Sequence, residues 1–506
     1  MYLTNILEYL EKTARELPDK TAFSDGDEFK SFNVLLNESK SIGTFLASEG
    51  YYKEPVVIFM NKHPDCLSAF FGVVYSGCFY VAIDSEMPQK RIELIFEKLS
   101  PRAVIYDYKN AERVNLLPEN YHKYLFDDIC KSVSDDNLLG EIRKKQIDTD
   151  PIYIVFTSGS TGVPKGVAAC HRSVIDYTET LCEAVGFDRE TVFGNQTPLY
   201  FDAPLKEIMP TIKLGATTYF IPKQLFMFPI KLCDYLNKYR INTVCWVVSA
   251  LTMISSLGAL EKNPPVYLRL ICFGSEVFPI KQYELWRKTC VNARFFNLYG
   301  PTEATGMSCY WEACRELEPG EPIPIGKPFR NTEIMLLDEN GREAEPGGEG
   351  EICIRGTCVT LGYYNDSEKT SEVFVQNPLN RAYSELIYRT GDIGKINKHG
   401  ELVFVSRKDS QIKHMGHRIE LGEIESSILT CEGVRQACCV YDAEKKRIIS
   451  FYTGNLTPEV LTKYLRDFLP RYMLPAKCVN LEFLPLTANG KLDRRKMSED
   501  ARNIEV

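Results

Sequence analysis

The stretch YIVFTSGSTGVPKGV, residues 153–167, joins an apolar segment to a loop rich in glycine and hydroxyl side chains. The apolar part predicts a buried strand, and the loop closes on Pro164, Lys165 and Gly166. Glycines let backbone N–H groups approach an anion closely, hydroxyls add donors, and the lysine adds a positive charge. The stretch therefore predicts a polyphosphate-binding loop, with an ordinary surface turn as the alternative.

This loop differs from the loop of the P-loop NTPases. In their signature the Gly-Lys pair is followed at once by Ser or Thr, whose hydroxyl binds magnesium. Here Lys165 follows Pro164 and precedes Gly166. The sequence therefore indicates a different nucleotide chemistry.

The composition is that of a globular protein with several folding units. The chain has 506 residues, of which 44% are hydrophobic and 25% are charged. A formal net charge of −8 and scattered basic residues argue against a nucleic-acid or membrane partner. The longest apolar stretch, residues 67–83, is interrupted by Gly72 and Gly77 and predicts a buried helix and strand rather than a membrane span.

The number and spacing of the cysteines and the N-terminal residues together indicate the cellular compartment. Seventeen cysteines are an odd number at low density, and no Cys-x-x-Cys pair occurs, which disfavours both a disulfide scaffold and a zinc site. Residues 1–16 predict an amphipathic helix rather than a secretory segment. We therefore expect a cytoplasmic protein with reduced thiols. We also expect a monomer.

Alternation of apolar strands with amphipathic helices predicts an α/β fold with large, layered sheets. Strands are predicted at residues 55–60, 103–107, 153–156, 243–248 and 268–273, and a helix at 88–100. After about residue 322, short strands at 333–338, 351–355 and 402–405 predict a small β-barrel-like subdomain. We expect these parts to form an N-terminal domain over residues 1–408.

The remaining residues, 409–506, predict a small, mobile α+β C-terminal domain. Helices are expected at 421–429 and 457–469, and strands at 436–441 and 447–452. The second helix has a Thr-Pro start and an apolar stripe.

Four further segments carry residue types suited to nucleotide chemistry. Residues 297–303, NLYGPTE, offer an amide, an aromatic ring, a hydroxyl and a carboxylate, although a simple Gly-Pro turn is the alternative. Residues 388–392, YRTGD, place a carboxylate where it could accept from ribose hydroxyls or only complete a turn. The other two are RKD at 407–409 and NGKLDR at 489–494.

Together and in this order, the five segments resemble the adenylation enzymes of the AMP-binding, acyl-adenylate-forming superfamily. The chain is most similar to amino-acid adenylation domains of nonribosomal peptide synthetases and to D-alanine–carrier protein ligases. The resemblance implies a ligase that activates an amino acid with ATP as aminoacyl-AMP, releases pyrophosphate, and forms a carbon–sulfur bond with the phosphopantetheine thiol of a carrier protein. An acyl- or aryl-CoA ligase is the first alternative, and an inactive nucleotide-binding paralogue is the second.

The resemblance also assigns ATP and Mg²⁺ to particular residues. Asn297 would meet the adenine amino group, and Asp392 and Arg407 would bind the ribose. Thr302 would hold the α-phosphate and Glu303 the magnesium ion. The β and γ phosphates would be held by Thr157, Ser158, Gly159, Ser160, Thr161, Gly162 and Lys165, and the adenine would be flanked by Tyr299, Gly300, Gly274, Ser275 and Glu276.

Lys491 is the expected catalytic residue of the first step, together with Thr302 and Glu303. Its ammonium would bridge the substrate carboxylate and the α-phosphoryl oxygens, whereas a solvated surface lysine is the alternative. Asp409 matches the hinge about which the C-terminal domain rotates between the two steps. Nothing after Lys491 resembles a carrier domain, so the carrier is expected to act in trans.

Substrate recognition is expected to centre on Asp202, which would pair with the substrate α-ammonium or else cap the helix that follows. The resemblance lines the side-chain pocket with Ala203, Lys206, Trp246, Ile271, Phe273, Leu298, Gly306 and Met307. These residues predict an apolar, shallow pocket for a small or medium side chain. Lys206 could accept an acidic substrate side chain, or it could pair with Glu207 or reach water.

Overall fold

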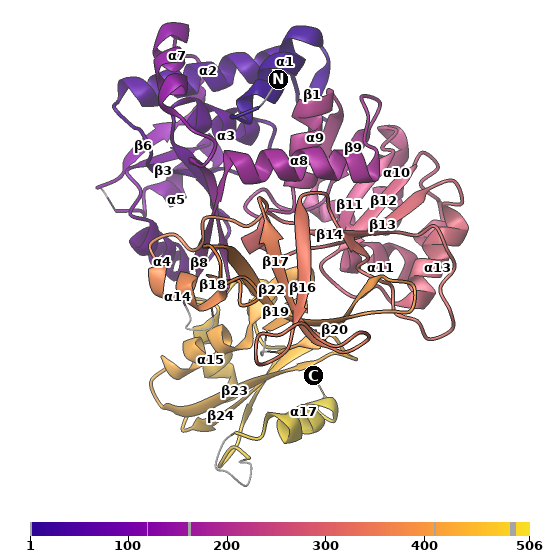
Figure 1. Ribbon diagram of the computed structural model, residues 1–506. Helices are drawn as coiled ribbons and strands as arrows, with labels where there is room; N and C mark the ends of the chain where they lie inside the picture. The colour runs from indigo at the N-terminus through magenta and orange to yellow at the C-terminus, as the bar shows by residue number, and fades with distance from the viewer. Residues whose placement is uncertain (1–2, 119, 160–162, 409–410, 486–491, 506) are drawn as a thin grey trace. The chain divides into compact units, whose positions relative to one another are not determined.

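The computed structural model describes residues 3–118, 120–159, 163–408, 411–485 and 492–505 (Figure 1). The chain divides into two compact units. The first contains the residues up to 85, residues 101–155 and residues 167–408, and the second contains residues 86–100, 156–166 and everything after 408. The second unit thus includes two segments that the sequence analysis places in an N-terminal domain.

A six-stranded sheet forms one layer of the first unit. Its order is β6 (His122–Leu125), β5 (Ala103–Tyr106), β3 (Pro55–Phe59), β4 (Phe79–Ala82), β7 (Pro151–Thr157) and β8 (Lys165–Cys170). Strands β6, β5, β3, β4 and β7 pair in parallel, as crossovers through helices require. The strands predicted at 55–60, 103–107 and 153–156 are confirmed to within two residues at either end.

A nine-stranded mixed sheet forms a second layer. Its order is β15 (Lys327–Pro328), β14 (Cys309–Glu312), β13 (Arg294–Tyr299), β12 (Leu270–Gly274), β11 (Thr243–Val247), β9 (Val192–Asn195), β10 (Thr217–Phe220), β1 (Thr21–Ser24) and β2 (Phe29–Ser31). The central strands from β1 to β13 are parallel, whereas β2, β14 and β15 add antiparallel edges. Because the central strands are covered on both faces, most of their residues are buried.

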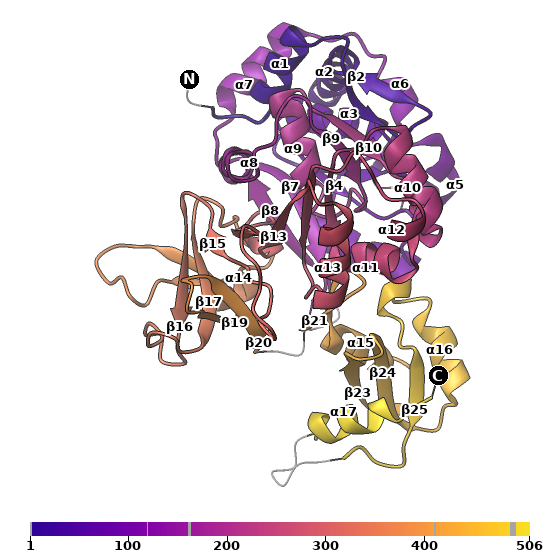
Figure 2. The same ribbon diagram turned by 90° about the vertical axis from the view of Figure 1, so that its right-hand side faces the viewer.

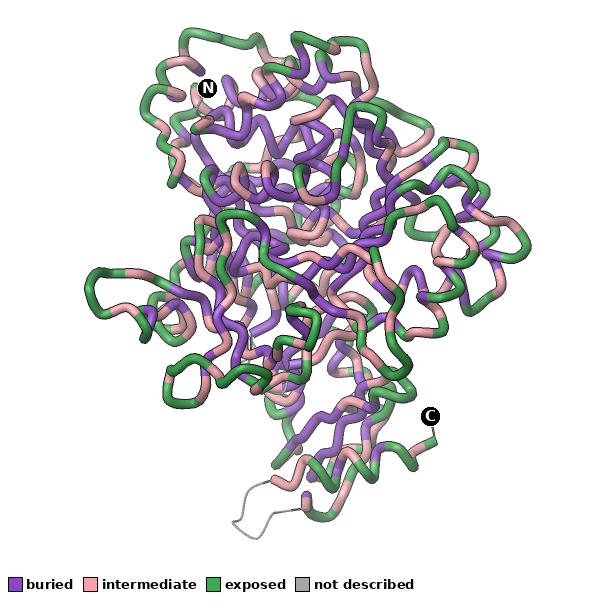
Figure 3. Tube along the Cα trace, turned by 45° about the vertical axis from the view of Figure 1, so that its right-hand side comes forward, coloured by how far each residue is buried: buried purple, intermediate pink, exposed green. Residues whose placement is uncertain are grey.

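Helices lie on both faces of the nine-stranded sheet. Helices α1 (Leu7–Glu16), α2 (Phe32–Ser48), α3 (Asp65–Tyr75), α8 (His171–Val185) and α9 (Leu205–Leu214) share one apolar cluster with residues of both sheets. Helices α10 (Pro229–Lys238), α11 (Val248–Ser256) and α13 (Ile280–Thr289) pack on the opposite face, around Trp246 and Trp286. Figure 3 shows that the buried segments gather in the strands and in the helices beside them. This layering confirms the predicted α/β class.

An antiparallel sheet completes the first unit. It consists of β16 (Thr332–Leu337), β17 (Gly350–Gly356), β19 (Leu386–Ile396), β18 (Phe374–Gln376) and β20 (Leu402–Arg407), which pairs with β19. Its register places Asp392 directly opposite Arg407. The predicted β-rich subdomain therefore brings together two residues that are fifteen positions apart in the sequence.

The second unit is built on a three-stranded sheet of β23 (Val434–Asp442), β24 (Arg447–Gly454) and β25 (Lys477–Asn480) (Figure 2). Helices α15 (Leu421–Leu429) and α16 (Pro458–Leu465) cover one face, and α17 (Arg494–Arg502) covers the other. A hairpin of β21 (Gln411–His414) and β22 (His417–Glu420) precedes α15, and α4 (Gln89–Leu99) joins this unit from the N-terminal half. The predicted helix 457–469 is wrong at its end, because the chain leaves the helix after Leu465 and reaches Pro470 through a turn.

None of the described helices combines the length and apolarity that a membrane-spanning segment needs. All seventeen cysteines lie in the described ranges, and each has a free thiol.

A buried histidine predicts a pH dependence of stability. His171 is 1% exposed, and its Nδ1 accepts a hydrogen bond from the Ile6 N–H at 3.2 Å. Burial lowers the His171 pKa to about 3, below its ordinary value of 6.5. Between pH 6.5 and 3 this histidine is protonated in the unfolded chain but not in the folded one. Acidification over this range should therefore lower the free energy of unfolding by up to about 1.4 kcal/mol per pH unit.

The change that tests this prediction is His171→Gln, which keeps an acceptor but cannot titrate. The free energy of unfolding of both proteins is measured in urea at several pH values. We expect the wild-type advantage over the variant to shrink as the pH falls below 6.5. An advantage that stays constant across this range would contradict the assignment.

Candidate functional site

The loop that follows β7 belongs to the second unit and is shaped by a close backbone approach. A Cβ atom on Gly159 would lie 2.1 Å from the Val163 carbonyl oxygen, so only glycine fits this position. Thr157 Oγ1 lies 3.5 Å from the Lys165 carbonyl, which it can donate to across the loop. The predicted residues Ser160, Thr161 and Gly162 lie outside the described residues.

This loop holds carboxylates of the same unit. The Gly159 N–H donates to Glu423 Oε2 at 3.1 Å, and Lys165 Nζ lies 4.0 Å from Glu420 Oε1. Glu423 also forms a buried ion pair with Arg91 of α4. Ser158 Oγ donates to the Arg418 carbonyl at 2.8 Å. In this structure the loop therefore contacts glutamate carboxylates of its own unit, and its binding of polyphosphate stays a prediction.

A second predicted group of residues meets at Asp392 in the first unit. Tyr299 Oη donates to Asp392 Oδ2 at 2.6 Å, and Arg407 Nη1 donates to Asp392 Oδ1 at 2.7 Å. Asp392 is 4% exposed, and the Arg407 guanidinium compensates its charge. Because each carboxylate oxygen can accept two hydrogen bonds, Asp392 retains acceptor capacity for hydroxyl groups.

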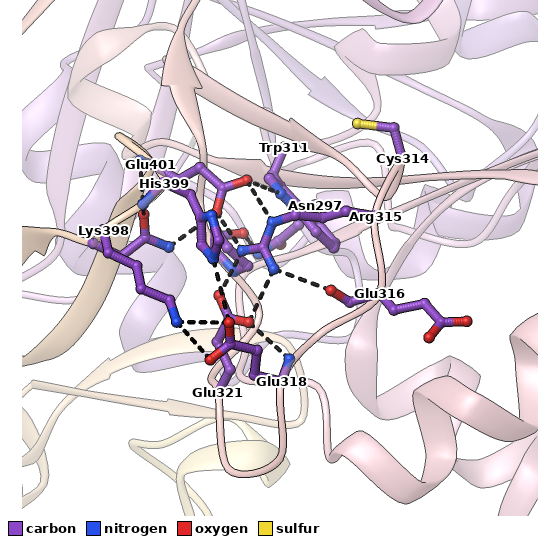
Figure 4. A network of polar contacts seen from close by, with 12 residues as sticks. Asn297, Trp311, Cys314, Arg315, Glu316, Glu318, Glu321, Lys398, His399 and Glu401 are labelled. Carbon is purple, nitrogen blue, oxygen red and sulfur yellow. Dashed lines mark hydrogen bonds and ion pairs between the residues drawn. The ribbon is translucent and has the colours of Figure 1, made fainter.

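Asn297 lies on β13 beneath a loop that a polar network holds in place (Figure 4). Its Nδ2 donates to the Pro324 carbonyl at 2.8 Å. In the same loop, Arg315 pairs with both Glu321 and Glu401 at 2.5 Å, and Glu401 also accepts from Trp311 Nε1. The network fixes the loop over the Asn297 amide.

At the ends of β12 and β13 the backbone lies so close to neighbouring backbone atoms that a side chain would not fit. A Cβ atom on Gly274 would lie 2.2 Å from the Leu298 carbonyl oxygen, and one on Gly300 would lie 2.5 Å from Met307 Cα. Ser275 has a φ of +67°, a conformation that non-glycine residues adopt at a cost. Glu276 Oε2 accepts from the Ser249 N–H at 2.7 Å and so fixes the turn.

Glu303 is a second buried carboxylate of the site, besides Asp392. It is 0% exposed, and Tyr363 Oη donates to its Oε1 at 2.7 Å. Sixty positions separate the two residues, so the sequence analysis missed Tyr363. Among the described residues, no group of three or more His, Cys, Asp or Glu side chains could hold a metal ion.

Asp202 lies beside Glu303 and next to the predicted phosphate residue Thr302. Burial raises the Asp202 pKa, whereas a hydrogen bond from the Thr302 side chain and the charge of Lys206 lower it. Asp202 does not cap α9, because the helix starts at Leu205 and its N-cap is Pro204, with no side-chain capping bond. The alternative that Asp202 caps this helix is therefore wrong.

The predicted pocket residues fall on two faces of the nine-stranded sheet. Leu298 and Met307 share the apolar cluster of α8 and α9. Gly306 lies there as well, since a Cβ atom on it would be 3.8 Å from Asp202 Oδ2. In contrast, Trp246, Ile271 and Phe273 belong to the cluster on the opposite face. Ala203 precedes α9, and Lys206 lies in its first turn.

Two residues on the α9 face escaped the sequence analysis. Cys245 precedes Trp246 and therefore points to the opposite face of β11, towards α9. It interacts electrostatically with Lys206 and Glu207. Tyr177 of α8 has its hydroxyl 4.0 Å from the Cβ position of Gly306. Strand alternation was the signal that could have identified Cys245.

The predicted hinge Asp409 and the predicted catalytic Lys491 lie outside the described residues.

Comparison with known proteins identifies a family whose models match most of the chain. Residues 10–364 match the family model described as AMP-binding enzyme, and residues 423–491 match the AMP-binding enzyme C-terminal domain. Tyrocidine synthase 1 of Brevibacillus parabrevis is 28% identical over 98% of this chain and 45% of that protein. Delta-poly-L-ornithine synthetase of Acinetobacter baumannii is 29% identical over 96% of this chain and 36% of that protein. The chain thus spans less than half the length of these relatives.

Solved structures share the fold over nearly the whole chain. Holo-PA1221, described as a nonribosomal peptide synthetase protein containing adenylation and carrier (PCP) domains, superimposes with a TM-score of 0.84 at 24% identity, covering 99% of this chain and 84% of that one. The o-succinylbenzoate CoA synthetase of Bacillus subtilis gives a TM-score of 0.80 at 20% identity, covering 97% and 98%. At these identities the likeness shows the fold.

Proposed function

Because the chain belongs to the AMP-binding enzyme family, we propose that it activates an amino acid as aminoacyl-AMP and transfers the aminoacyl group to a carrier thiol. In the first step a substrate carboxylate oxygen attacks the α-phosphorus of ATP, and pyrophosphate leaves. In the second step the thiol sulfur of a phosphopantetheine arm attacks the acyl carbon, and AMP leaves. The observation that carries the amino-acid assignment is the partly buried Asp202 carboxylate beside Thr302 and Gly306.

Residues of the first unit would bind the adenine, the ribose and the α-phosphate of the nucleotide. Asp392, held by Tyr299 and Arg407, would accept from the ribose hydroxyls. Asn297 would accept from the adenine amino group, and Thr302 would donate to the α-phosphate. The backbone around Gly274, Ser275 and Glu276, together with Gly300, would flank the ring.

The residues present fit a magnesium ion. Mg²⁺ prefers hard oxygen ligands and is usually held by one or two carboxylates plus substrate phosphates. Glu303 offers a buried carboxylate that Tyr363 orients. When bound, the ion would neutralise charge that develops on the ATP phosphates.

The remaining roles fall to the second unit. The loop with Thr157, Ser158, Gly159 and Lys165 would hold the β and γ phosphates, and its contact with glutamate carboxylates supports this assignment. The neighbouring residues Ser160, Thr161 and Gly162 would share this role. Lys491 would stabilise the charge that builds between the carboxylate and the α-phosphoryl group. Asp409 would act as the hinge between the two steps.

We also propose the enzyme's partners and location. A carrier protein with a phosphopantetheine arm would receive the product in trans, as the adenylation and carrier domains named for the holo-PA1221 structure suggest. Neither a nucleic acid nor a membrane is a proposed partner, and the protein would act as a cytoplasmic monomer.

An acyl- or aryl-CoA ligase is the second candidate, because the fold is shared with a CoA synthetase. Its carboxylic acid substrates have no α-ammonium, so a partly buried aspartate at position 202 would gain nothing from them. An inactive nucleotide-binding paralogue is less favoured, since Lys165, Glu303, Asp392 and Lys491 are all present.

The test of the proposed function is ATP–pyrophosphate exchange with each of the twenty amino acids, D-alanine, and simple hydroxy and aryl acids. We expect one amino acid, or a small chemically related group, to stimulate exchange. Stimulation by an aryl or fatty acid alone would favour the CoA ligase, and exchange with none of them would favour the inactive paralogue.

Asp202→Ala is expected to raise the KM for the amino acid by about 100-fold, because a desolvated charge pair to the α-ammonium is lost. The KM for ATP should change little. Rates of ATP–pyrophosphate exchange, measured at varied concentrations of the amino acid and then of ATP, give the two KM values separately. The matched control is Asp127→Ala, since Asp127 is exposed. Equal changes in both KM values would argue against this role for Asp202.

A further inference from the structure

The loop between β14 and β15 holds the side-chain amide of Asn297 in one orientation. Asn297 lies on β13 and is 8% exposed, and its Nδ2 donates to the Pro324 carbonyl at 2.8 Å. An amide has a donor end and an acceptor end, so a contact that fixes Nδ2 also fixes the direction of the acceptor Oδ1. A rotation by 180° would exchange the two ends. The Pro324 carbonyl therefore decides whether Asn297 presents an acceptor or a donor to a ligand.

The guanidinium of Arg315 clamps this loop onto the first unit (Figure 4). Arg315 lies near the start of the loop, and its Nη1 donates to Glu321 Oε2 at 2.9 Å, three residues before Pro324. Its Nη2 donates to Glu401 Oε2 at 2.5 Å, outside the loop and next to β20. An arginine can bridge two carboxylates in this way because its guanidinium presents five N–H donors in a planar fork.

Glu401 connects the clamp to the strand beside Asn297. Its Oε1 accepts from Trp311 Nε1 at 2.8 Å, and Trp311 lies directly opposite Asn297 in the antiparallel pair of β13 and β14. The Trp311 side chain is only 4% exposed and packs in the cluster around Trp246. Arg315 is thus linked to the surroundings of Asn297 on two sides, through the loop that carries Pro324 and through Trp311.

The clamp consists of charges that are partly shielded from water. The side chains of Arg315, Glu321 and Glu401 are 24%, 13% and 19% exposed. Hydrogen bonds from Arg315 lower the Glu321 pKa to about 2, so this carboxylate is ionised at neutral pH. Without the arginine, two carboxylates would face one another uncompensated. Their repulsion would move the loop and, with it, the carbonyl that holds the Asn297 amide.

We propose that Arg315 is a positioning residue that sets the nucleobase selectivity of the site, by keeping Oδ1 of Asn297 directed at the 6-amino group of adenine. This inference rests on the proposed function, which places adenine at Asn297. A purine with only a hydrogen atom at position 6 offers no donor to Oδ1. Loss of the clamp should therefore weaken the binding of adenine nucleotides and leave the binding of such a purine nucleotide unchanged.

The test measures the Kd of ATP and of purine riboside triphosphate, each with Mg²⁺, by isothermal titration calorimetry. The analogue differs from ATP only in lacking the 6-amino group. For the wild-type protein we expect ATP to bind about tenfold more tightly, which is the size of effect that one hydrogen bond gives. In Arg315→Met the Kd for ATP should rise towards that of the analogue, whose own Kd should not change.

The matched control is Arg355→Met. Arg355 also bridges two glutamates, Glu333 at 2.8 Å and Glu385, but it lies on β17 of the antiparallel sheet. We expect this variant to keep the wild-type preference for ATP. If Arg315→Met fails to fold, Glu321→Gln carries the test, because it removes one of the two charges that Arg315 bridges. This variant should also lower the preference for ATP, and an unchanged preference would contradict the inference.

The possible outcomes separate a positioning role from a merely structural one. Equal rises in both Kd values for Arg315→Met would mean that the arginine only stabilises the fold, and would overturn the inference. A preference for ATP that persists in this variant would also overturn it, as would equal binding of both nucleotides by the wild-type protein. Failure of the proposed function is a different result, since no amino acid would then stimulate ATP–pyrophosphate exchange, whatever the ratio of the two Kd values.

Discussion

Replacing Lys491 by alanine is expected to abolish amino-acid-dependent ATP–pyrophosphate exchange and to leave thioester formation from preformed aminoacyl-AMP largely intact. The first step builds negative charge between the substrate carboxylate and the α-phosphoryl oxygens. Loss of one group that stabilises such charge typically costs about 100- to 1000-fold in rate. The second step expels AMP and places no comparable charge at this position, so it should not require the lysine.

The control for this experiment is Lys496→Ala, an exposed lysine on α17 in the same unit. Exchange and single-turnover thiolation are measured on the same preparations. Lys496→Ala should retain both activities. Equal loss of both steps in Lys491→Ala would mean that the substitution disturbs the C-terminal unit as a whole, and the catalytic assignment would fail.

Local sequence patterns predicted most elements but not the contacts between distant residues. Helix α15 has the predicted bounds, because Leu421, Ile424 and Ile428 repeat at helical spacing and are all buried. The family was recognisable because its motifs are short and contiguous. The contact of Tyr363 with Glu303 and the pair of Arg91 with Glu423 join residues 60 and 332 positions apart. No periodicity encodes such pairings, since they arise only when separate elements pack.

The substrate pocket gives a second example, because the motifs alone did not show on which face of the sheet each residue lies. Motif alignment grouped Trp246 and Phe273 with Leu298, although the two sets of residues pack on opposite faces of the sheet. Register explains the difference: Phe273 pairs with Asn297, so the next residue, Leu298, points to the other face. Strand alternation, applied together with the motifs, would have placed Cys245 beside α9.

Replacing Arg91 by methionine is expected to destabilise the second unit around α15. Arg91 is 6% exposed, and Glu423, its partner, is fully buried. Removing one member of a buried ion pair leaves the other charge without compensation, which costs about 3–5 kcal/mol. If local opening governs exchange, about 3 kcal/mol corresponds to roughly 100-fold faster amide hydrogen exchange. Mass spectrometry of peptides covering residues 418–429 measures this directly.

Two further variants distinguish the effect of leaving the Glu423 charge unpaired from a general disturbance of the structure. The double variant Arg91→Met with Glu423→Leu replaces both charges by apolar groups, and such replacements of whole buried pairs are often neutral. The double variant should therefore regain most of the protection against amide hydrogen exchange that Arg91→Met loses. The exposed pair of Arg102 and Glu54, 2.8 Å apart, provides the surface control, because Arg102→Met should change exchange by only a few-fold. If Arg91→Met behaves like Arg102→Met, the buried pair does not stabilise this unit. Recovery in the double variant would instead show that Arg91 serves chiefly to neutralise Glu423, whose Oε2 accepts from the Gly159 N–H of the loop.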